Sequence, residues 1–172
     1  DIVGIIPSTA QIAVLLGDGA GGFAAATTYS TGASTVPSDI AVLQSSADTF
    51  LDVAVSNTGT NNVALFVNKG DGTFNAATNQ AAGFATHGIA AGDTNKDSKD
   101  DAVVTDGVKN YTWLKGAANG TLAAQATAVN DNAPTNQQAL TIGDTDHDGK
   151  VDVITVDNQA TGAARPGGFP MH

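Results

Sequence analysis

Asp144-Thr145-Asp146-His147-Asp148-Gly149-Lys150-Val151-Asp152 is a stretch with aspartate at its first, third, fifth and ninth positions and glycine at its sixth. Oxygen side chains at alternate positions can turn toward one point, and Gly149 lets the backbone bend sharply between them. A calcium ion takes about six to eight oxygen ligands, which carboxylates and a carbonyl of such a stretch can supply. The apolar run at residues 153–156 follows at once and is typical of a strand. The stretch therefore predicts a calcium loop inside a β protein.

Two further copies of this frame and a second motif recur along the chain. Residues 93–101 repeat the frame before an apolar run, and residues 44–52 repeat it in a weaker form, so that the first positions lie 49 and 51 residues apart. The second motif, Gly70-Asp71-Gly72-Thr73-Phe74, matches residues 19–23 and has a weaker copy at residues 117–122. Two motifs with one period of about 50 residues indicate an internal repeat, which is typical of propellers and solenoids.

One period also contains several short strand candidates. Residues 51–56, 63–68, 74–80 and 87–91 are strand-like, with a polar turn at residues 57–62 and a hairpin turn at residues 69–72. Helical periodicity with capping residues is missing from every longer segment. Four strands in about 50 residues fit one blade of a β-propeller.

The sequence at residues 92–104, G-D-x-N-x-D-x-x-x-D-x-x-V, and at residues 63–74, V-x-L-F-x-N-x-G-D-G-T-F, resembles the FG-GAP/VCBS repeat. The resemblance extends over roughly residues 1–158. It implies an all-β fold of β-propeller-like four-stranded blades, in which the acidic loop binds calcium between strands. Integrin α-chain heads, lectins and secreted bacterial surface proteins contain such repeats. The resemblance therefore implies an extracellular or cell-surface module that is structural or adhesive, with a lectin-like carbohydrate-binding module as the alternative.

The repeats divide the chain into approximate units. We expect repeats at residues 1–43, 44–92 and 93–143, a partial repeat at residues 144–158 and a Gly/Pro-rich tail at residues 159–172. Closed propellers usually have about four to eight blades, and an unclosed row leaves strand edges exposed. The alternatives are a homo-oligomer or filament, an open stack and a fragment of a larger cell-surface propeller, of which we favour self-association.

The two stronger loops define the expected metal ligands. These are the side chains of Asp144, Asp146, Asp148 and Asp152 with the Lys150 carbonyl, and the side chains of Asp93, Asn95, Asp97 and Asp101 with the Lys99 carbonyl. Loop 93–101 has one carboxylate fewer, so we expect weaker binding there, and we expect Asp100 to face solvent. Magnesium is the alternative metal, but it keeps more of its waters and suits a ligand-rich loop less well.

The loop at residues 44–52 has lost several of these ligands. Gln44 and Ser46 replace two acids and Thr49 replaces the glycine, which leaves Asp48 and Asp52 as weak ligands. We therefore prefer a neutral turn that side-chain hydrogen bonds hold in place.

Composition restricts the partners. The chain has seven Lys and Arg residues and seventeen acidic residues, all of them aspartate, so its net charge is −10. Such a charge disfavours nucleic acid and anionic membranes as partners. Scattered acids such as Asp39 and Asp106 are interpreted as solubilising surface charges. Cysteine is absent, which excludes a thiol nucleophile, and no apolar run is long enough to span a membrane.

The remaining candidates are weaker. His87, His147 and His172 show no metal spacing and no triad arrangement, so we expect no enzymatic activity. Tyr111 and Trp113 would stack on a sugar ring if exposed, but core packing is the interpretation that we favour. Asn110 and Asn119 each begin an N-glycosylation sequon, and Asn119 lies on an expected turn.

Overall fold

The computed structural model describes residues 1–108, 110–130 and 137–157. The described residues form an all-β fold, as predicted, with a single 3-10 turn at Pro7–Thr9. The strands are β1 (Ile2–Ile6), β2 (Gln11–Leu15), β3 (Thr27–Ser30), β4 (Pro37–Leu43), β5 (Asp52–Asn57), β6 (Asn62–Phe66), β7 (Thr78–Ala81), β8 (Gly88–Gly92), β9 (Asp101–Thr105), β10 (Asn110–Ala117), β11 (Thr121–Asn130), β12 (Gln137–Gly143) and β13 (Asp152–Asp157). No helix among these residues has the length and apolar character needed to cross a membrane.

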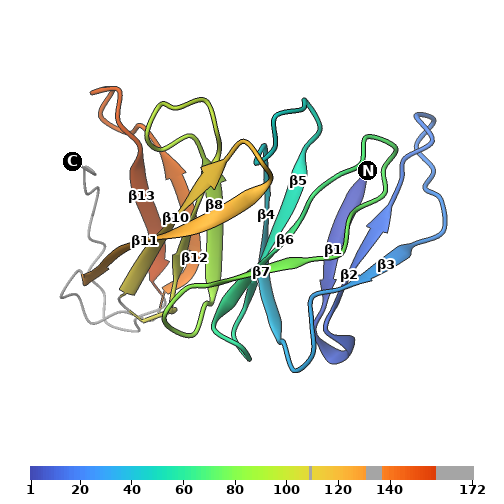
Figure 1. Ribbon diagram of the computed structural model, residues 1–172, viewed down its shortest axis with the longest axis horizontal. Helices are drawn as coiled ribbons and strands as arrows, with labels where there is room; N and C mark the ends of the chain where they lie inside the picture. The colour runs from blue at the N-terminus through green and yellow to red at the C-terminus, as the bar shows by residue number, and fades with distance from the viewer. Residues whose placement is uncertain (109, 131–136, 158–172) are drawn as a thin grey trace.

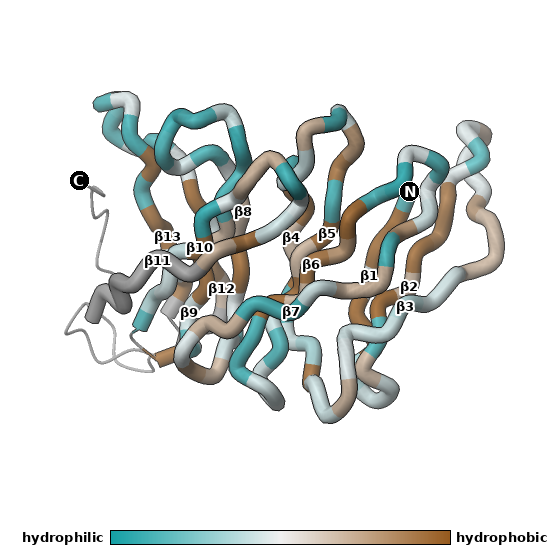
Figure 2. Tube along the Cα trace, in the orientation of Figure 1, coloured by the Kyte–Doolittle hydropathy of each residue, from teal (hydrophilic) through white to brown (hydrophobic). Residues whose placement is uncertain are grey.

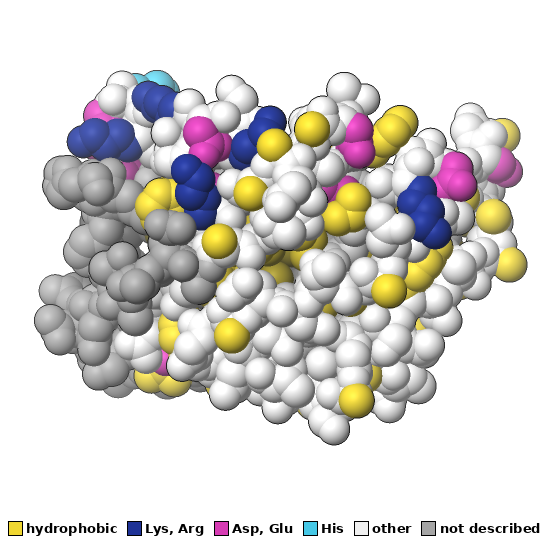
Figure 3. Space-filling model, in the orientation of Figure 1, with side chains coloured by type: hydrophobic (Ala, Val, Ile, Leu, Met, Phe, Trp, Pro, Cys, Tyr) yellow, Lys and Arg dark blue, Asp and Glu magenta, His cyan; other side chains and the backbone are white. Residues whose placement is uncertain are grey.

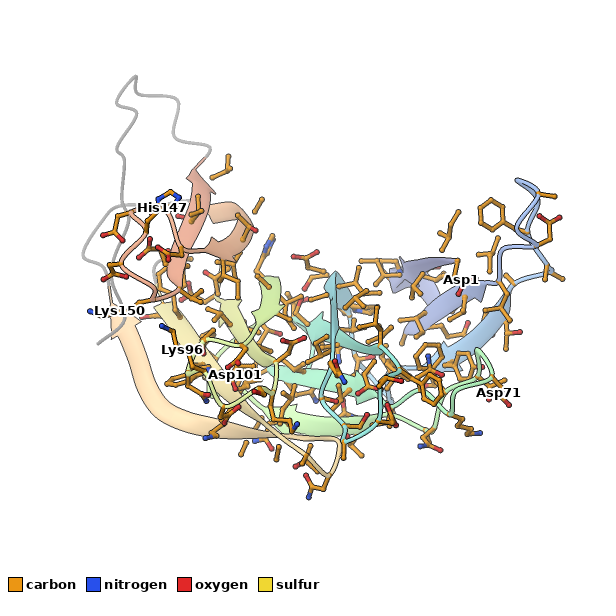
Figure 4. The ribbon with its side chains drawn as sticks, turned by 90° about the horizontal axis from the view of Figure 1, so that it is seen from above. Asp1, Asp71, Lys96, Asp101, His147 and Lys150 are labelled. Atoms are coloured by element: carbon orange, nitrogen blue, oxygen red, sulfur yellow. The ribbon has the colours of Figure 1, made fainter. Side chains whose placement is uncertain are left out.

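The strands pair into antiparallel sheets that follow the repeat. Two sheets have four strands, in the orders β4-β5-β6-β7 and β8-β9-β10-β11, while β1-β2-β3 and β12-β13 form smaller sheets. The sheets stand side by side as blades of a propeller do (Figure 1), and from above they follow an arc (Figure 4). Their innermost strands are neighbours, because β4 contacts β8 and β8 contacts β12.

The sheets begin at a different point of the repeat from the predicted units. Pro37, Gly88 and Gln137 start the strands β4, β8 and β12, which is seven, five and seven residues ahead of the loops at which the predicted repeats begin. The length of the repeat is the same in both cases. The predicted units and the sheets therefore divide the same repeat at different points. The predicted tail at residues 159–172 lies outside the described residues.

The hairpins that carry the loops close with the same register. Leu43 pairs with Asp52, Gly92 with Asp101 and Gly143 with Asp152. The expected hairpin turn also forms, with a bridge between Asn68 and Phe74 and a positive φ of 80° at Gly72. A positive φ at this position is costly for any residue with a side chain, which explains the glycine.

Apolar side chains fill the spaces between the sheets. Strand β5 is buried along its whole length, because Val53 and Val55 pack toward the first sheet while Ala54 packs toward the third. Strand β9 of the third sheet is likewise buried on both faces. Val104 belongs to the cluster shared with the second sheet, and Val103 belongs to the cluster shared with β12. The apolar segments accordingly run through the middle of the strands (Figure 2). Each sheet therefore depends on its neighbours for its core.

The first sheet differs from the others at one repeat position. Phe74 and Leu122 are buried, but the equivalent Phe23 is 50% exposed. Phe74 packs edge-on against Tyr29 of the first sheet, with ring centroids 5.6 Å apart. Phe23 differs because the first sheet is the outermost one in the described row, so no preceding sheet covers it there.

Candidate metal centre

The three repeated loops lie on one rim of the molecule. They connect β4 to β5, β8 to β9 and β12 to β13, and they protrude at the upper edge in Figure 1. Aspartate and lysine side chains gather along this edge in the space-filling view (Figure 3). Loops 93–101 and 144–152 are neighbours, because a Cβ atom added to Gly149 would lie 3.1 Å from the Lys96 Nζ atom. Lys96 and Lys150 accordingly appear close together in Figure 4.

The aspartate at the ninth position of each loop is a buried structural anchor. Asp52 and Asp101 are fully buried and Asp152 is 3% exposed. One carboxylate oxygen accepts hydrogen bonds from the backbone N–H and hydroxyl of the second loop residue, which is Ser45, Thr94 or Thr145.

The other oxygen of this aspartate reaches the next strand of the sheet. Asp52 accepts a hydrogen bond from the N–H of Asn68, and Asp101 accepts one from the N–H of Gly116, each at 2.8 Å. Asp1 accepts the equivalent bond from the N–H of Gly17, also at 2.8 Å. The ninth-position carboxylate therefore ties the loop, its own strand and the following strand together.

Loop 144–152 brings three predicted ligands to one point. One oxygen each of Asp144, Asp146 and Asp152 lie within 4.8 Å of one another. The N–H groups of Gly149 and Asp148 donate to Asp144 and Asp146 at 2.9 and 3.0 Å, which uses one oxygen of each acid. The remaining oxygens can face a cation. Carboxylates this close repel each other unless a cation neutralises them, so the residues fit a divalent ion.

Loop 93–101 repeats these hydrogen bonds position by position. The N–H of Ser98 donates to Asp93 at 2.8 Å, and the N–H of Asp97 donates to Asn95 at 2.9 Å. The N–H of Lys99 donates to Asp97 at 3.0 Å, as the N–H of Lys150 does to Asp148 at 2.8 Å in the other loop. The two loops therefore share a backbone hydrogen-bond pattern, although among the described residues only Asp144, Asp146 and Asp152 bring three carboxylates to one point.

The backbone of both loops turns through the left-handed region at the same two positions. The φ angles are 63° at Lys96 and 64° at Ser98 in one loop, and 64° at His147 and 81° at Gly149 in the other. Ser98 adopts this conformation without being glycine, at a cost of roughly 1 kcal/mol. The side chain of His147 is exposed, as expected of a position that supplies no ligand.

Loop 44–52 has a different conformation. None of its residues has a positive φ angle. Instead, the Asp48 carboxylate accepts hydrogen bonds from the Ser46 hydroxyl at 3.0 Å and from the Phe50 N–H at 2.9 Å. Asp52 uses both oxygens as described above. This is the hydrogen-bonded turn that we weighed against a weak metal site.

In each of loops 93–101 and 144–152, a lysine side chain also contacts the aspartate at the fifth loop position. Lys150 lies 3.4 Å from the Asp148 carboxylate within its own loop. Lys115, which comes from β10, lies 2.9 Å from the Asp97 carboxylate. The hydrogen bond from Lys115 lowers the pKa of Asp97, and the same bond raises the pKa of Lys115. The side-chain and backbone hydrogen bonds from Thr145 hold the pKa of Asp152 below its ordinary value of 3.8.

Three acids that we expected at the surface form hydrogen bonds instead. Asp100 accepts a hydrogen bond from the Gln44 N–H at 2.7 Å, so it joins two neighbouring loops and does not simply face solvent. Asp39 accepts one from the Ile89 N–H of the next sheet at 3.0 Å. Asp106 accepts one from the Val108 N–H at 2.7 Å within a turn. Aspartate serves in these places because its short carboxylate satisfies backbone donors that would otherwise be unpaired.

The two aromatic residues on β10, Tyr111 and Trp113, differ in their surroundings. Tyr111 packs against the buried cluster of Ala90, Val103 and Leu140, between the third and fourth sheets. Trp113 is half-buried and pairs in register with Val103. Tyr111 thus packs as we favoured over sugar stacking, whereas Trp113 belongs to none of the apolar clusters of the described residues.

The two sequons differ in accessibility. Asn110 lies in a strand and its side-chain amide donates to the Asp106 carboxylate, while Thr112 is buried. Asn119 is exposed in the turn between β10 and β11, and the Thr121 hydroxyl donates to its amide oxygen at 2.7 Å. Of the two, only Asn119 is presented to a glycosylating enzyme in the folded chain.

A hollow of about 300 Å³ lies between the innermost strands, lined by Ser38, Asp39, Ile40, His87, Ile89, Ala139 and Leu140. The Ser38 hydroxyl donates to the backbone carbonyl of His87 at 2.8 Å and not to its ring. The two carboxylate oxygens of Asp39 accept hydrogen bonds from the N–H groups of Ile40 and Ile89. The Ser38 hydroxyl and the Asp39 carboxylate are thus engaged by backbone groups on both sides of the hollow. His172 lies outside the described residues.

Comparison with known proteins agrees with the fold and the loops. Residues 46–104 match the family model described as the FG-GAP-like repeat. This part of the chain therefore carries an FG-GAP-like repeat, as the resemblance of residues 63–74 and 92–104 predicted. A search of curated proteins found no match to the chain. Repeats of this family are generally structural or adhesive, typically belong to larger extracellular proteins and often bind calcium.

Proposed function

We propose that this chain is a calcium-binding repeat module of an extracellular or cell-surface protein, with a structural or adhesive role and no catalytic one. The observation that carries the proposal is the convergence of Asp144, Asp146 and Asp152, whose oxygens lie within 4.8 Å of one another. The shared conformation of loop 93–101 supports a second site. The FG-GAP-like repeat at residues 46–104 supports both the module and its location.

Calcium would be held by the same residues that shape the loops. In loop 144–152 these are the side chains of Asp144, Asp146, Asp148 and Asp152 and the carbonyl of Lys150. In loop 93–101 they are the side chains of Asp93, Asn95, Asp97 and Asp101 and the carbonyl of Lys99. A bound ion supplies the positive charge that these clustered carboxylates need, and a rigid loop in turn fixes the hairpin that carries it. The function of the ion in this proposal is therefore to stabilise the blade.

The test is calcium titration by calorimetry together with thermal unfolding in calcium and in chelator. A ligand that binds the folded state alone stabilises it by about 2.7 kcal/mol at a concentration of 100 times its Kd. We expect a higher melting temperature in calcium, and we expect Asp148→Ala to remove the part of this gain that belongs to loop 144–152.

The matched control is Asp48→Ala in the turn at residues 44–52. This variant removes the same carboxylate from a loop without the metal-type backbone, so its calcium affinity should equal that of the wild type. Equal melting temperatures of the wild type in calcium and in chelator would contradict the proposal.

Self-association is the second part of the proposal. Large apolar side chains are exposed on the two end sheets of the described row, including Phe23 at 50% and Val156 at 61%. Their burial between copies of the chain would favour an oligomer or filament. Light scattering in calcium should then show a mass above that of one chain, reduced by Phe23→Ser. A monodisperse monomer at high protein concentration would contradict this part.

A further inference from the structure

Lys115 is a charged residue at a repeat position that is apolar in the first two sheets. Asp1, Asp52 and Asp101 accept hydrogen bonds from the N–H groups of Gly17, Asn68 and Gly116, respectively. These three donors therefore occupy equivalent positions in the first three sheets. The residues directly before them are Leu16, Val67 and Lys115. A lysine therefore stands in the third sheet where the two preceding sheets have an apolar side chain.

This lysine reaches a predicted ligand of loop 93–101. Its Nζ atom lies 2.9 Å from one oxygen of Asp97, while the other oxygen accepts the Lys99 N–H at 3.0 Å. Both oxygens of the fifth-position acid are thus engaged. Lys115 is held on β10, which pairs with β9 on one side and with β11 on the other. Its ammonium group is therefore presented to the loop by the sheet.

The equivalent acid of the other loop is paired differently. Lys150 contacts Asp148 at the longer distance of 3.4 Å and belongs to the loop itself. Its side chain is 46% exposed, close to the 43% of Lys115, but its backbone lies in the loop and not in a strand. Lys99, which has the same position in loop 93–101, instead donates to the Ser98 carbonyl at 3.2 Å.

We propose that Lys115 is a built-in counter-ion of loop 93–101 that weakens its binding of divalent cations, so that the chain has one stronger and one weaker calcium site. A cation that enters this loop must displace an ammonium group from Asp97 and then remain close to its positive charge. This inference rests on the calcium-binding function proposed above.

The test removes the charge of Lys115 and measures loop 93–101 alone. Calorimetric titration with calcium chloride is carried out on the full chain with Asp146→Ala, which disables loop 144–152, alone and combined with Lys115→Met. Because both the ion pair and the repulsion of the cation disappear, we expect binding about tenfold tighter in the Lys115→Met variant. We also expect the gain to shrink at high salt, which screens the charge.

Lys69→Met in the same background is the matched control. It changes the net charge equally but lies in the hairpin turn of the second sheet, and its calcium affinity should stay within about twofold of the background at moderate salt, where distant charges are screened. Lys115→Gln provides a second neutral variant should the methionine disturb folding, which circular dichroism detects.

The outcomes separate the two proposals. Calcium binding by the wild type with equal affinities for the Lys115 and Lys69 variants would overturn the role of Lys115 and leave the proposed function standing. Absence of calcium binding in every protein, the Lys115 variants included, would overturn both.

Discussion

At the scale of single residues, the ninth-position aspartate has two separable roles. Asp52 keeps the same buried position and the same hydrogen bonds as Asp101, although its loop has lost the metal-type backbone. The carboxylate therefore organises the hairpin without help from an ion. In loop 144–152 the same residue, Asp152, also has an oxygen within 4.8 Å of Asp144 and Asp146, where it can serve as a ligand as well.

We predict that Asp52→Ala destabilises the protein by about 2–4 kcal/mol, because buried donors of Ser45 and Asn68 lose their acceptor. The loss should be the same in calcium and in chelator, since loop 44–52 is a hydrogen-bonded turn. Urea unfolding under both conditions measures it. Asp48→Ala removes an exposed carboxylate of the same loop and should cost less than half as much. A calcium-dependent loss in Asp52→Ala would show instead that the loop binds the ion.

At the scale of elements, neighbouring hairpins are joined at their loops. The Asp100 carboxylate accepts the Gln44 N–H, and the Asp100 N–H donates to the Gln44 carbonyl at 3.2 Å. The Gly120 N–H donates to the Ser45 carbonyl at 3.1 Å, so the turn after β10 also contacts the loop of the second sheet. The loop that lacks a metal-type backbone is thus fixed by the sheet beside it.

The contact between the loops requires a glycine at position 116. A Cβ atom there would lie 2.0 Å from the carbonyl oxygen of Asp100, which is too close for either backbone to remain in place. We predict that Gly116→Ala displaces Asp100, costs about 2–3 kcal/mol in urea unfolding and weakens calcium binding at loop 93–101. Gly4→Ala is the control, since a Cβ at Gly4 meets nothing within 4 Å. Equal stability of the two variants would contradict this account.

At the scale of the whole molecule, the sheets share their cores. The cluster between the second and third sheets includes Leu65 of β6, Ile89 of β8 and Leu114 of β10, all of them buried. A sheet that loses its neighbour therefore exposes one complete apolar face. Unfolding of these sheets should be coupled for this reason.

We predict that Leu114→Ala lowers the free energy of unfolding by about 2–5 kcal/mol, because the shared core keeps a cavity at the deleted side chain. Tryptophan fluorescence, which reports on Trp113 in the third sheet, and far-ultraviolet circular dichroism, which reports on all sheets, should change together. Val156→Ala at a 61% exposed position should stay within about 0.5 kcal/mol of the wild type. Separate transitions for the two probes would show that the sheets unfold independently.

Short-range features of the sequence were sufficient to predict most strands, turns and loops, although the strand expected at residues 74–80 forms only at Thr78–Ala81. Strand β5 begins one residue after the predicted start, and Gly72 adopts the expected positive φ. Such features depend on residues within about ten positions of each other, where backbone preference and side-chain alternation act directly. The convergence of Asp144, Asp146 and Asp152 belongs to this group, because all three lie within nine residues of one loop.

Contacts between distant residues were not predictable in the same way. The bond from Gln44 to Asp100 spans 56 positions, and the exposure of Phe23 depends on which sheet lies next to it. The contact of Lys115 with Asp97 likewise needs the register of β9 and β10. The sequence by itself therefore determined the repeat and its acidic loops, whose geometry is local. Only the tertiary structure decided which aspartates join sheets and which loop carries a lysine from a neighbouring strand, because those contacts arise from the packing of segments far apart in the chain.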